Sequence, residues 1–156
     1  MQSDDLHAIE GWLGGMLASL KPGERKRFAI KVMRLVRREN VGRISRNEEP
    51  DGGSMAPRKS RLDRSGKVER RGKMFRKIRL LKNLKIKASP DGGELHFVNP
   101  LIEKTAAIHH FGEEGRVGKT RDGRTIRTRY AARRLLGFGN KERDAILDLA
   151  VDHLKS

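Results

Sequence analysis

The most regular pattern of hydrophobic and polar positions lies in the middle of the chain, over residues 84–112. Its first part alternates apolar and polar residues on both sides of a central turn, the period of strands with one buried face. The turn, Ser89-Pro90-Asp91-Gly92-Gly93, contains the residue types that reverse a chain tightly. The pattern therefore predicts a β-hairpin with Leu95 and Phe97 on its buried face, and we expect the core to centre on residues 84–112.

A helix is predicted directly after this hairpin. Asn99 is a suitable N-cap, Pro100 fits the first helical position because it lacks an N–H, and Gly112 is a typical C-terminal stop. The same helical spacing of apolar residues recurs elsewhere, with Asn140 expected to cap the last helix. The full set of predicted helices covers residues near 4–20, 22–46, 74–81, 100–111 and 140–154. We therefore expect an α+β fold, a small antiparallel sheet centred on 84–98 packed with several helices, in one domain spanning 1–156.

Two segments have no face to bury. Residues 47–72 lack a hydrophobic period and are rich in Gly, Pro and basic side chains, which predicts a long basic loop that is flexible in the free protein. Residues 113–129 contain Asp122-Gly123 between two basic stretches, a signal for a hairpin. Val117 and Ile126 are the only apolar strand residues of this hairpin, so we expect it to form an exposed arm.

The positive charge of the chain is concentrated. Residues 58–87 hold 14 Lys/Arg and 2 Asp/Glu, so most of the net charge of +16 lies in this block. Such a block attracts a nucleic acid or an acidic protein surface, or forms a solvated loop. Nucleic-acid binding usually adds aromatic side chains for stacking, and Phe75 is the only aromatic residue in the block. The composition favours protein assembly, with nucleic-acid binding and a solvated loop as alternatives.

No pattern in the sequence predicts catalysis. Gly118-Lys119-Thr120 resembles the end of a phosphate-binding loop, but Glu113 occupies the position where that loop needs its first Gly. His109 and Glu113 are one helical turn apart, yet no third metal ligand follows at a suitable spacing. The histidines form no triad with an activated Ser, and no paired carboxylates lie in an apolar setting. We therefore expect no enzyme, no metal and no cofactor.

The setting of the protein is also indicated by its composition. The chain has no cysteine, so a disulfide framework and thiolate chemistry are excluded. No apolar run approaches the roughly 20 residues of a membrane span, and the acidic first ten residues do not resemble a signal peptide. We therefore expect a soluble protein that is made in a reducing cytoplasm and has no membrane partner.

Four groups of residues together resemble a known family. The loop segments NEEPDG (47–52) and APRK (56–59), with MFRKIR (74–79), IHHFG (108–112) and YAARRLLG (130–137), are similar in order to motifs of phage virion morphogenesis proteins of the tail completion protein S type. The second histidine of IHHFG stands where that family usually has Gln, and the first alanine of YAARRLLG where it has Pro. The resemblance covers nearly the whole chain.

This resemblance implies a structural protein of a tailed phage or prophage, without catalytic activity. It would act at the head-proximal end of the tail tube, in tail assembly and head–tail joining. Its location would be the tail of the virion, which is assembled in the bacterial host cytoplasm. The implied partners are further copies in a ring that matches the six-fold symmetry of the tail, and other tail and neck proteins. Contact with nucleic acid would be only incidental. A small basic nucleic-acid-binding protein is the alternative.

The basic loop and the hairpin arm are the predicted partner interface, because arginine-rich segments bind carboxylates well and order against neighbouring subunits. The candidate interface residues are Arg58, Lys59, Arg70, Arg71, Arg116, Arg121, Arg124, Arg127 and Arg129.

Overall fold

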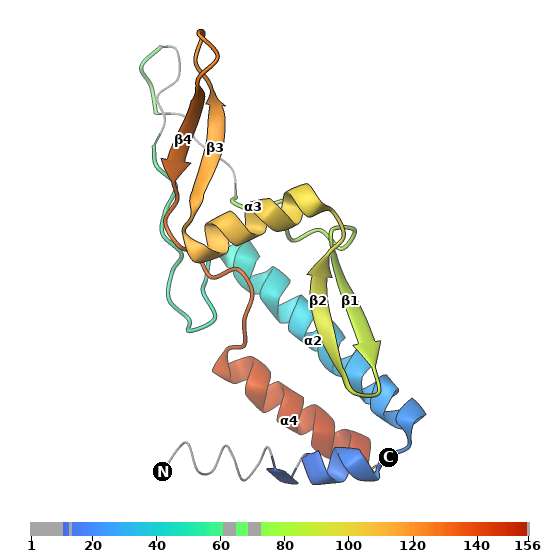
Figure 1. Ribbon diagram of the computed structural model, residues 1–156. Helices are drawn as coiled ribbons and strands as arrows, with labels where there is room; N and C mark the ends of the chain where they lie inside the picture. Colours follow the sequence, from blue (N-terminus) through green and yellow to red (C-terminus); the bar gives the residue numbers. More distant parts are fainter. Residues whose placement is uncertain (1–10, 13, 61–64, 69–72, 156) are drawn as a thin grey trace.

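The computed structural model describes residues 11–12, 14–60, 65–68 and 73–155 of the chain. Residues 11, 12 and 14–19 are helical and precede the longest helix. The named elements are α2 (Pro22–Arg46), β1 (Leu84–Ser89), β2 (Gly92–Phe97), α3 (Pro100–Phe111), β3 (Glu114–Lys119), β4 (Thr125–Arg129) and α4 (Asn140–Lys155) (Figure 1). The predicted α+β fold is confirmed.

Helix α2 is the central element of the molecule. It packs against β1, β2 and α4, while α3 lies across the end of β2 (Figure 1). The main cluster of buried apolar residues surrounds the C-terminal end of α2 and draws on segments far apart in sequence: Ile44, Met55, Met74, Ile78, Ala106 and Leu135. The core therefore does not centre on residues 84–112 as expected, because α2 offers a longer apolar face than a two-stranded hairpin.

The ends of the helices follow from local chemistry. Lys21 is the N-cap of α2, with Pro22 at the first helical position, and Asn47 ends the helix in the left-handed conformation at φ 57°. The Oδ1 atom of Asn99 accepts hydrogen bonds from the backbone N–H groups at the start of α3, and Gly112 ends α3 at φ 68°. The predicted helices 22–46 and 100–111 are thus confirmed, as are the predicted caps Asn99 and Gly112 of the second.

The strands form two separate antiparallel sheets. In the first, β1 pairs with β2 in a register that places Leu84 opposite Phe97 and Ile86 opposite Leu95. Leu84 is buried, and Leu95 and Phe97 are half-buried, so the predicted hairpin and its buried face are confirmed. The second sheet, β3–β4, is a hairpin that projects from one end of the molecule (Figure 1).

The predicted helix over residues 74–81 does not form. The segment is a series of turns in which Phe75 adopts a left-handed conformation at φ 58°, incompatible with a continuous helix. Met74 and Ile78 are buried as the apolar spacing indicated, but Leu81 is 59% exposed. The apolar period was therefore correct for two anchor residues and wrong for the helix between them.

The last helix begins at Asn140, the residue that was predicted to be its cap. The carbonyl of Gly139 accepts a hydrogen bond from the N–H of Arg143 at 3.1 Å, so Asn140 is the first helical residue and Gly139 holds the cap position. Helix α4 otherwise covers the predicted span, and the ring of Phe28 on α2 lies 5.3 Å from that of His153 on α4.

Candidate assembly interface

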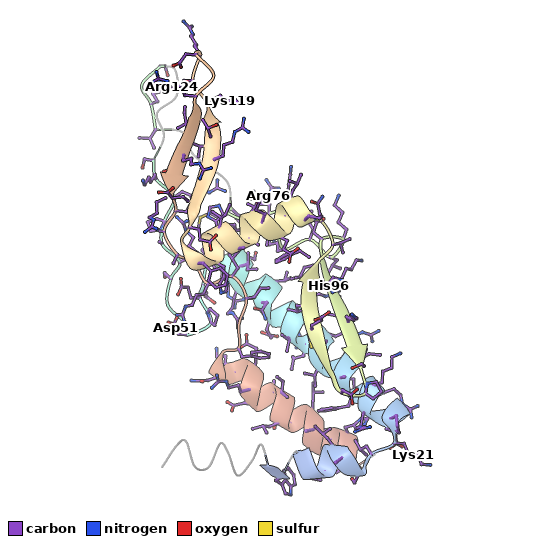
Figure 2. The ribbon with its side chains drawn as sticks, viewed as in Figure 1. Lys21, Asp51, Arg76, His96, Lys119 and Arg124 are labelled. Carbon is purple, nitrogen blue, oxygen red and sulfur yellow. The ribbon has the colours of Figure 1, made fainter. Side chains whose placement is uncertain are left out.

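The β3–β4 hairpin arm carries uncompensated positive charge. Arg116 and Arg127 are directly opposite each other in the register, an arrangement in which like charges repel. Lys119 and Arg124 lie toward the far end of the arm (Figure 2). Among the described residues, the pair of Arg124 Nε with Asp122 Oδ2, at 3.1 Å, is the only ion pair of the arm. The arm therefore presents charge that the subunit itself does not neutralise.

The root of the arm is fixed to α3 by an aromatic chain. The ring of His109 lies 5.0 Å from that of Phe75 and 4.4 Å from that of Tyr130. Gly115 is buried at this root, and a Cβ there would come within 2.8 Å of the Tyr130 ring, so the close approach requires glycine. The N–H of Tyr130 also donates to the carbonyl of Glu113 at 3.1 Å, so the base of the arm is rigidly placed.

A basic cleft of about 770 Å³ lies beside this root. Its lining includes the buried or half-buried side chains of Met74, Phe75, Ile78 and Tyr130. Six exposed cations line it as well: Arg58, Lys59, Lys73, Arg76, Lys77 and Arg129. The described lining residues include no Asp or Glu, so the cleft combines an apolar wall with a strongly positive rim.

Two neighbouring arginines attach the loop after α2 to the segment after β4. The guanidinium of Arg133 donates from Nε to the Ala56 carbonyl at 2.6 Å and from Nη2 to the Pro57 carbonyl at 2.8 Å. Arg134 donates from Nε to Glu49 Oε2 at 3.0 Å and also pairs with Asp51. The Gly53 N–H and Arg134 lower the pKa of the Asp51 carboxyl, which stays ionised.

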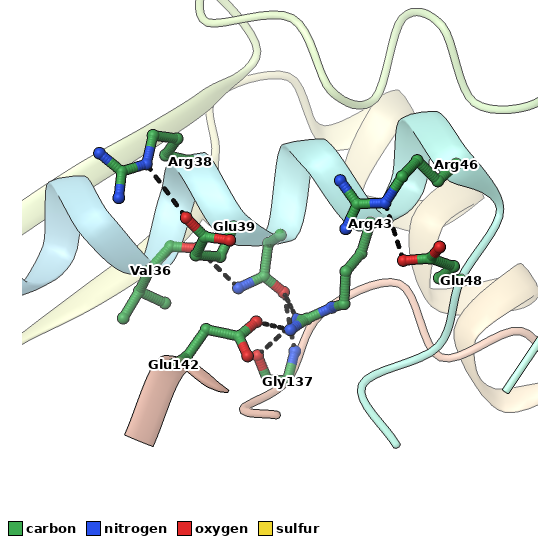
Figure 3. Close-up of polar contacts among 9 residues, drawn as sticks. Val36, Arg38, Glu39, Arg43, Arg46, Glu48, Gly137 and Glu142 are labelled. Atoms are coloured by element: carbon green, nitrogen blue, oxygen red, sulfur yellow. Dashed lines mark hydrogen bonds and ion pairs between the residues drawn. The ribbon is translucent and has the colours of Figure 1, made fainter. Parts of the chain in front are cut away.

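A buried polar cluster joins α2, α4 and the glycine-rich segment between β4 and α4 (Figure 3). Arg43 donates from Nη2 to Asn40 Oδ1 at 2.7 Å and to the Gly137 carbonyl at 2.8 Å, and its Nη1 pairs with Glu142. The N–H of Gly137 returns a hydrogen bond to Asn40 Oδ1 at 3.0 Å. Burial lowers the pKa of Arg43, which nevertheless keeps its charge opposite the carboxylate of Glu142.

The two adjacent histidines of α3 have different structural roles. His109 belongs to the aromatic chain, and the Nδ1 atom of His110 accepts a hydrogen bond from the Leu135 N–H at 3.1 Å. Burial is the main cause that lowers the pKa of both rings, with Arg133 adding to it for His109 and Arg134 for His110. Both histidines are therefore neutral at pH 7.

The structure brings some of the predicted interface residues together. Arg58, Lys59 and Arg129 line the basic cleft, although the first two and the third come from distant parts of the chain. The other described candidates are exposed along the arm: Arg116, Arg121, Arg124 and Arg127. Arg70 and Arg71 lie outside the described residues.

Sequence reasoning missed several residues that shape this region. The contribution of Arg76, Lys77 and Lys73 to the cleft depends on a chain path that no periodicity encodes. A usable signal did exist for the buried cluster: Asn40 and Arg43 interrupt the apolar stripe of α2 at helical spacing, between Val36 and Ile44. Polar residues in such a stripe indicate a buried partner.

Two further findings limit the chemistry of the described residues. They contain no group of three or more His, Cys, Asp or Glu side chains placed to hold a metal ion. None of the helices that the structure describes is both long enough and apolar enough to cross a membrane.

The family motifs converge on this one region. The 47–59 loop is held by Arg133 and Arg134, Phe75 contacts His109, and His110 accepts from Leu135, so segments distant in sequence pack together. The chain belongs to the phage virion morphogenesis family, whose sequence profile matches residues 4–155.

A curated relative is similar over almost its full length. The chain is 33% identical over 154 residues, 97% of this chain and 99% of the relative, to a protein of Escherichia phage P2 named tail completion protein S. No solved structure shows a significant match to this chain.

Proposed function

We propose that this chain is a structural tail completion protein of a tailed phage or prophage. It acts at the head-proximal end of the tail tube, where it completes the tail and allows the tail to join the head. The observation that carries the proposal is the near full-length similarity to tail completion protein S of phage P2. The convergence of the family motifs on one packed region supports it, because similarity then extends to the residues that position the arm and the cleft.

The proposal includes the partners and the place of action. The partners are other copies of the chain in a closed ring, six being the number that matches the tail, and neighbouring tail and neck proteins. The final location is the tail of the virion, reached by assembly in the bacterial cytoplasm. The arm supports this role because its arginines are exposed and not paired with carboxylates, apart from Arg124 with Asp122, within the described residues. The proposed role is structural and requires no catalysis.

Charge reversal on the arm tests the function. Arg121, Arg124 and Arg127 are exposed and lie outside the cleft, so changing all three to Glu should leave the fold intact. In an infected or induced cell, we expect separate heads and tails to accumulate, seen by electron microscopy of the lysate. The matched control is Lys82, Lys85 and Lys104 changed to Glu, which reverses three exposed charges elsewhere. Normal yields of joined particles from the arm variant would refute the proposed role of the arm.

A further inference from the structure

We propose that copies of this chain associate head to tail, with the basic cleft of one copy receiving the acidic face of α4 of the next. The inference deepens the proposed function and rests on it for its biological meaning. The contact itself is argued from charge and exposure in the structure, and it concerns residues to which the family similarity assigns no role.

The cleft side of the contact is a site with unsatisfied charge. Within the described part of the chain, none of its six exposed cations is in an ion pair, and no carboxylate lines the cleft beside them. Exposed cations gathered over an apolar wall repel one another and raise the local positive potential. A carboxylate-bearing surface with small apolar groups is the complementary occupant.

Helix α4 carries such a surface. Asp144, Asp148 and Asp152 recur every four residues, so they stand on one face of the helix, and all three are exposed. The half-exposed Val151 lies next to them and is the apolar element of this acidic face. No ion pair joins these three aspartates to any described residue of the same chain. Exposed Lys141 and Lys155 flank this face at its two ends without forming an ion pair with the aspartates, so the face is a short negative ridge on a strongly positive protein.

The two surfaces belong to different parts of an elongated subunit. The arm projects from one end, while α4 lies near the other, packed on α2 through its opposite face (Figure 1). A contact between different surfaces of identical subunits is heterologous, so a pair of copies still has one free cleft and one free acidic face. Repetition of that contact closes a ring when the rotation between copies permits it.

The aromatic residues favour a protein occupant over a nucleic acid. Binding of single strands uses exposed aromatic faces on which bases stack. Here the rings of Phe75, His109 and Tyr130 line the cleft but contact one another, at centroid distances of 5.0 and 4.4 Å, which restricts the faces on which a base could stack. The cleft thus offers ionic and apolar contacts, which suit the aspartates and valine of α4.

Reciprocal charge reversal tests the contact in the purified full-length protein. The cleft variant is Arg76→Glu with Lys77→Glu, and the α4 variant is Asp144→Lys with Asp148→Lys; all four side chains are exposed. Sedimentation equilibrium at about 50 mM NaCl should show concentration-dependent association of the wild type, weakened at about 500 mM salt. Each variant should raise the dissociation constant roughly tenfold or more, because like charges then face each other.

Mixing the two variants is the decisive step. The cleft variant retains a normal α4, and the α4 variant retains a normal cleft, so the mixture should associate where each variant alone does not. The reversed cleft and the reversed α4 are also complementary, so this association can continue beyond a 1:1 pair. A chain carrying all four reversals should associate again, since its charges are exchanged rather than removed. The control variant Lys82→Glu with Lys85→Glu alters exposed cations outside the cleft and should associate like the wild type.

Several results would overturn the contact. The first is a wild type that stays monomeric at about 100 μM, well above a micromolar dissociation constant. The second is that the single-surface variants associate like the wild type. The third is that mixing the two variants does not restore association. If self-association is absent and the wild type binds a 20-nucleotide single strand that the cleft variant does not bind, the cleft is assigned to nucleic acid instead. Failure here leaves the function standing if the arm variant still blocks head–tail joining, because the arm residues reversed in that experiment do not line the cleft.

Discussion

At the scale of single residues, the buried cluster around Arg43 decides how α4 is fixed to the molecule. Arg43 and Glu142 are only 6% and 4% exposed, and each is the charged partner of the other. Removing one member of a buried pair leaves the other charge desolvated, which is costlier than replacing both. The cluster is therefore more a constraint on geometry than a source of net stability.

We predict a non-additive double-mutant cycle at this pair. Glu142→Gln should destabilise the protein by roughly 3–5 kcal/mol, because Arg43 loses its carboxylate in a buried site. The combined variant Arg43→Met with Glu142→Leu should be more stable than either single apolar change. Urea denaturation followed by circular dichroism measures the free energy of unfolding of the wild type and of these four variants. Additive losses would show that the pair is not energetically coupled.

The histidines of α3 give the protein a dependence on pH. Their pKa values are lowered in the folded state, so the unfolded chain binds more protons at mildly acidic pH. Their contribution to stability is complete above the unfolded pKa of about 6.5 and is lost as the pH falls below it toward the lower folded values. For His110, protonation at Nδ1 also removes the acceptor used by the Leu135 N–H.

We therefore predict that the free energy of unfolding falls between pH 7.5 and pH 5. His110→Asn is the matched variant, because an amide oxygen can take the place of Nδ1 as acceptor and does not titrate. The variant should show a shallower pH dependence than the wild type, with His109 accounting for the remainder. Equal slopes in thermal or urea unfolding would show that His110 does not contribute.

At the scale of elements, the sequence predicted most of the features that depend on neighbouring residues, such as helix caps and hairpin turns. The caps of α3 and the two hairpin turns depend on a few neighbouring residues, and the sequence predicted all of them. The 74–78 turns depend instead on a left-handed Phe75 whose ring meets His109, a residue 34 positions away along the chain. The cleft depends on the same tertiary contact, which is why its basic rim was only partly predicted.

The loop after α2 also has a part that is fixed by contacts with distant residues and a part that is exposed. Its first part is tied down: Met55 is buried, and Arg133 holds the carbonyls of Ala56 and Pro57. Beyond these anchors Arg58 and Lys59 are exposed. The flexibility predicted for residues 47–72 stays a prediction, and the anchors restrict where it applies.

We predict that limited trypsin digestion cleaves first between Arg58 and Lys73, after the last anchored carbonyl. Exposed Lys85 and Lys87, in the paired strand β1, should be cut later because their backbone is hydrogen-bonded to β2. Mass spectrometry of early fragments identifies the sites. First cleavage within β1 would contradict this assignment.

At the scale of the whole molecule, the distribution of charge decides which binding experiments can distinguish a protein partner from a nucleic acid. A net charge of +16 ensures some attraction to any polyanion, whatever the biological role. Exposed positive groups lie on the arm, around the cleft and along α2, and the exposed aspartates of α4 lie apart from those of the arm and cleft. Binding to DNA therefore does not by itself indicate a nucleic-acid-binding function, whereas selectivity between DNA sequences would.

The last prediction is that DNA binding is weak, salt-dependent and indifferent to sequence. Charge alone gives dissociation constants of about 10⁻⁴–10⁻⁶ M at physiological salt, and the engaged rings of Phe75 and Tyr130 add little stacking. Fluorescence anisotropy with several unrelated duplexes and single strands should give similar affinities that fall together as salt rises. Arg76→Glu with Lys77→Glu should weaken all of them alike, since phosphate contacts carry no sequence information. A preference of about 1,000-fold for one sequence, in the range of specific DNA-binding proteins, would instead favour the nucleic-acid-binding alternative.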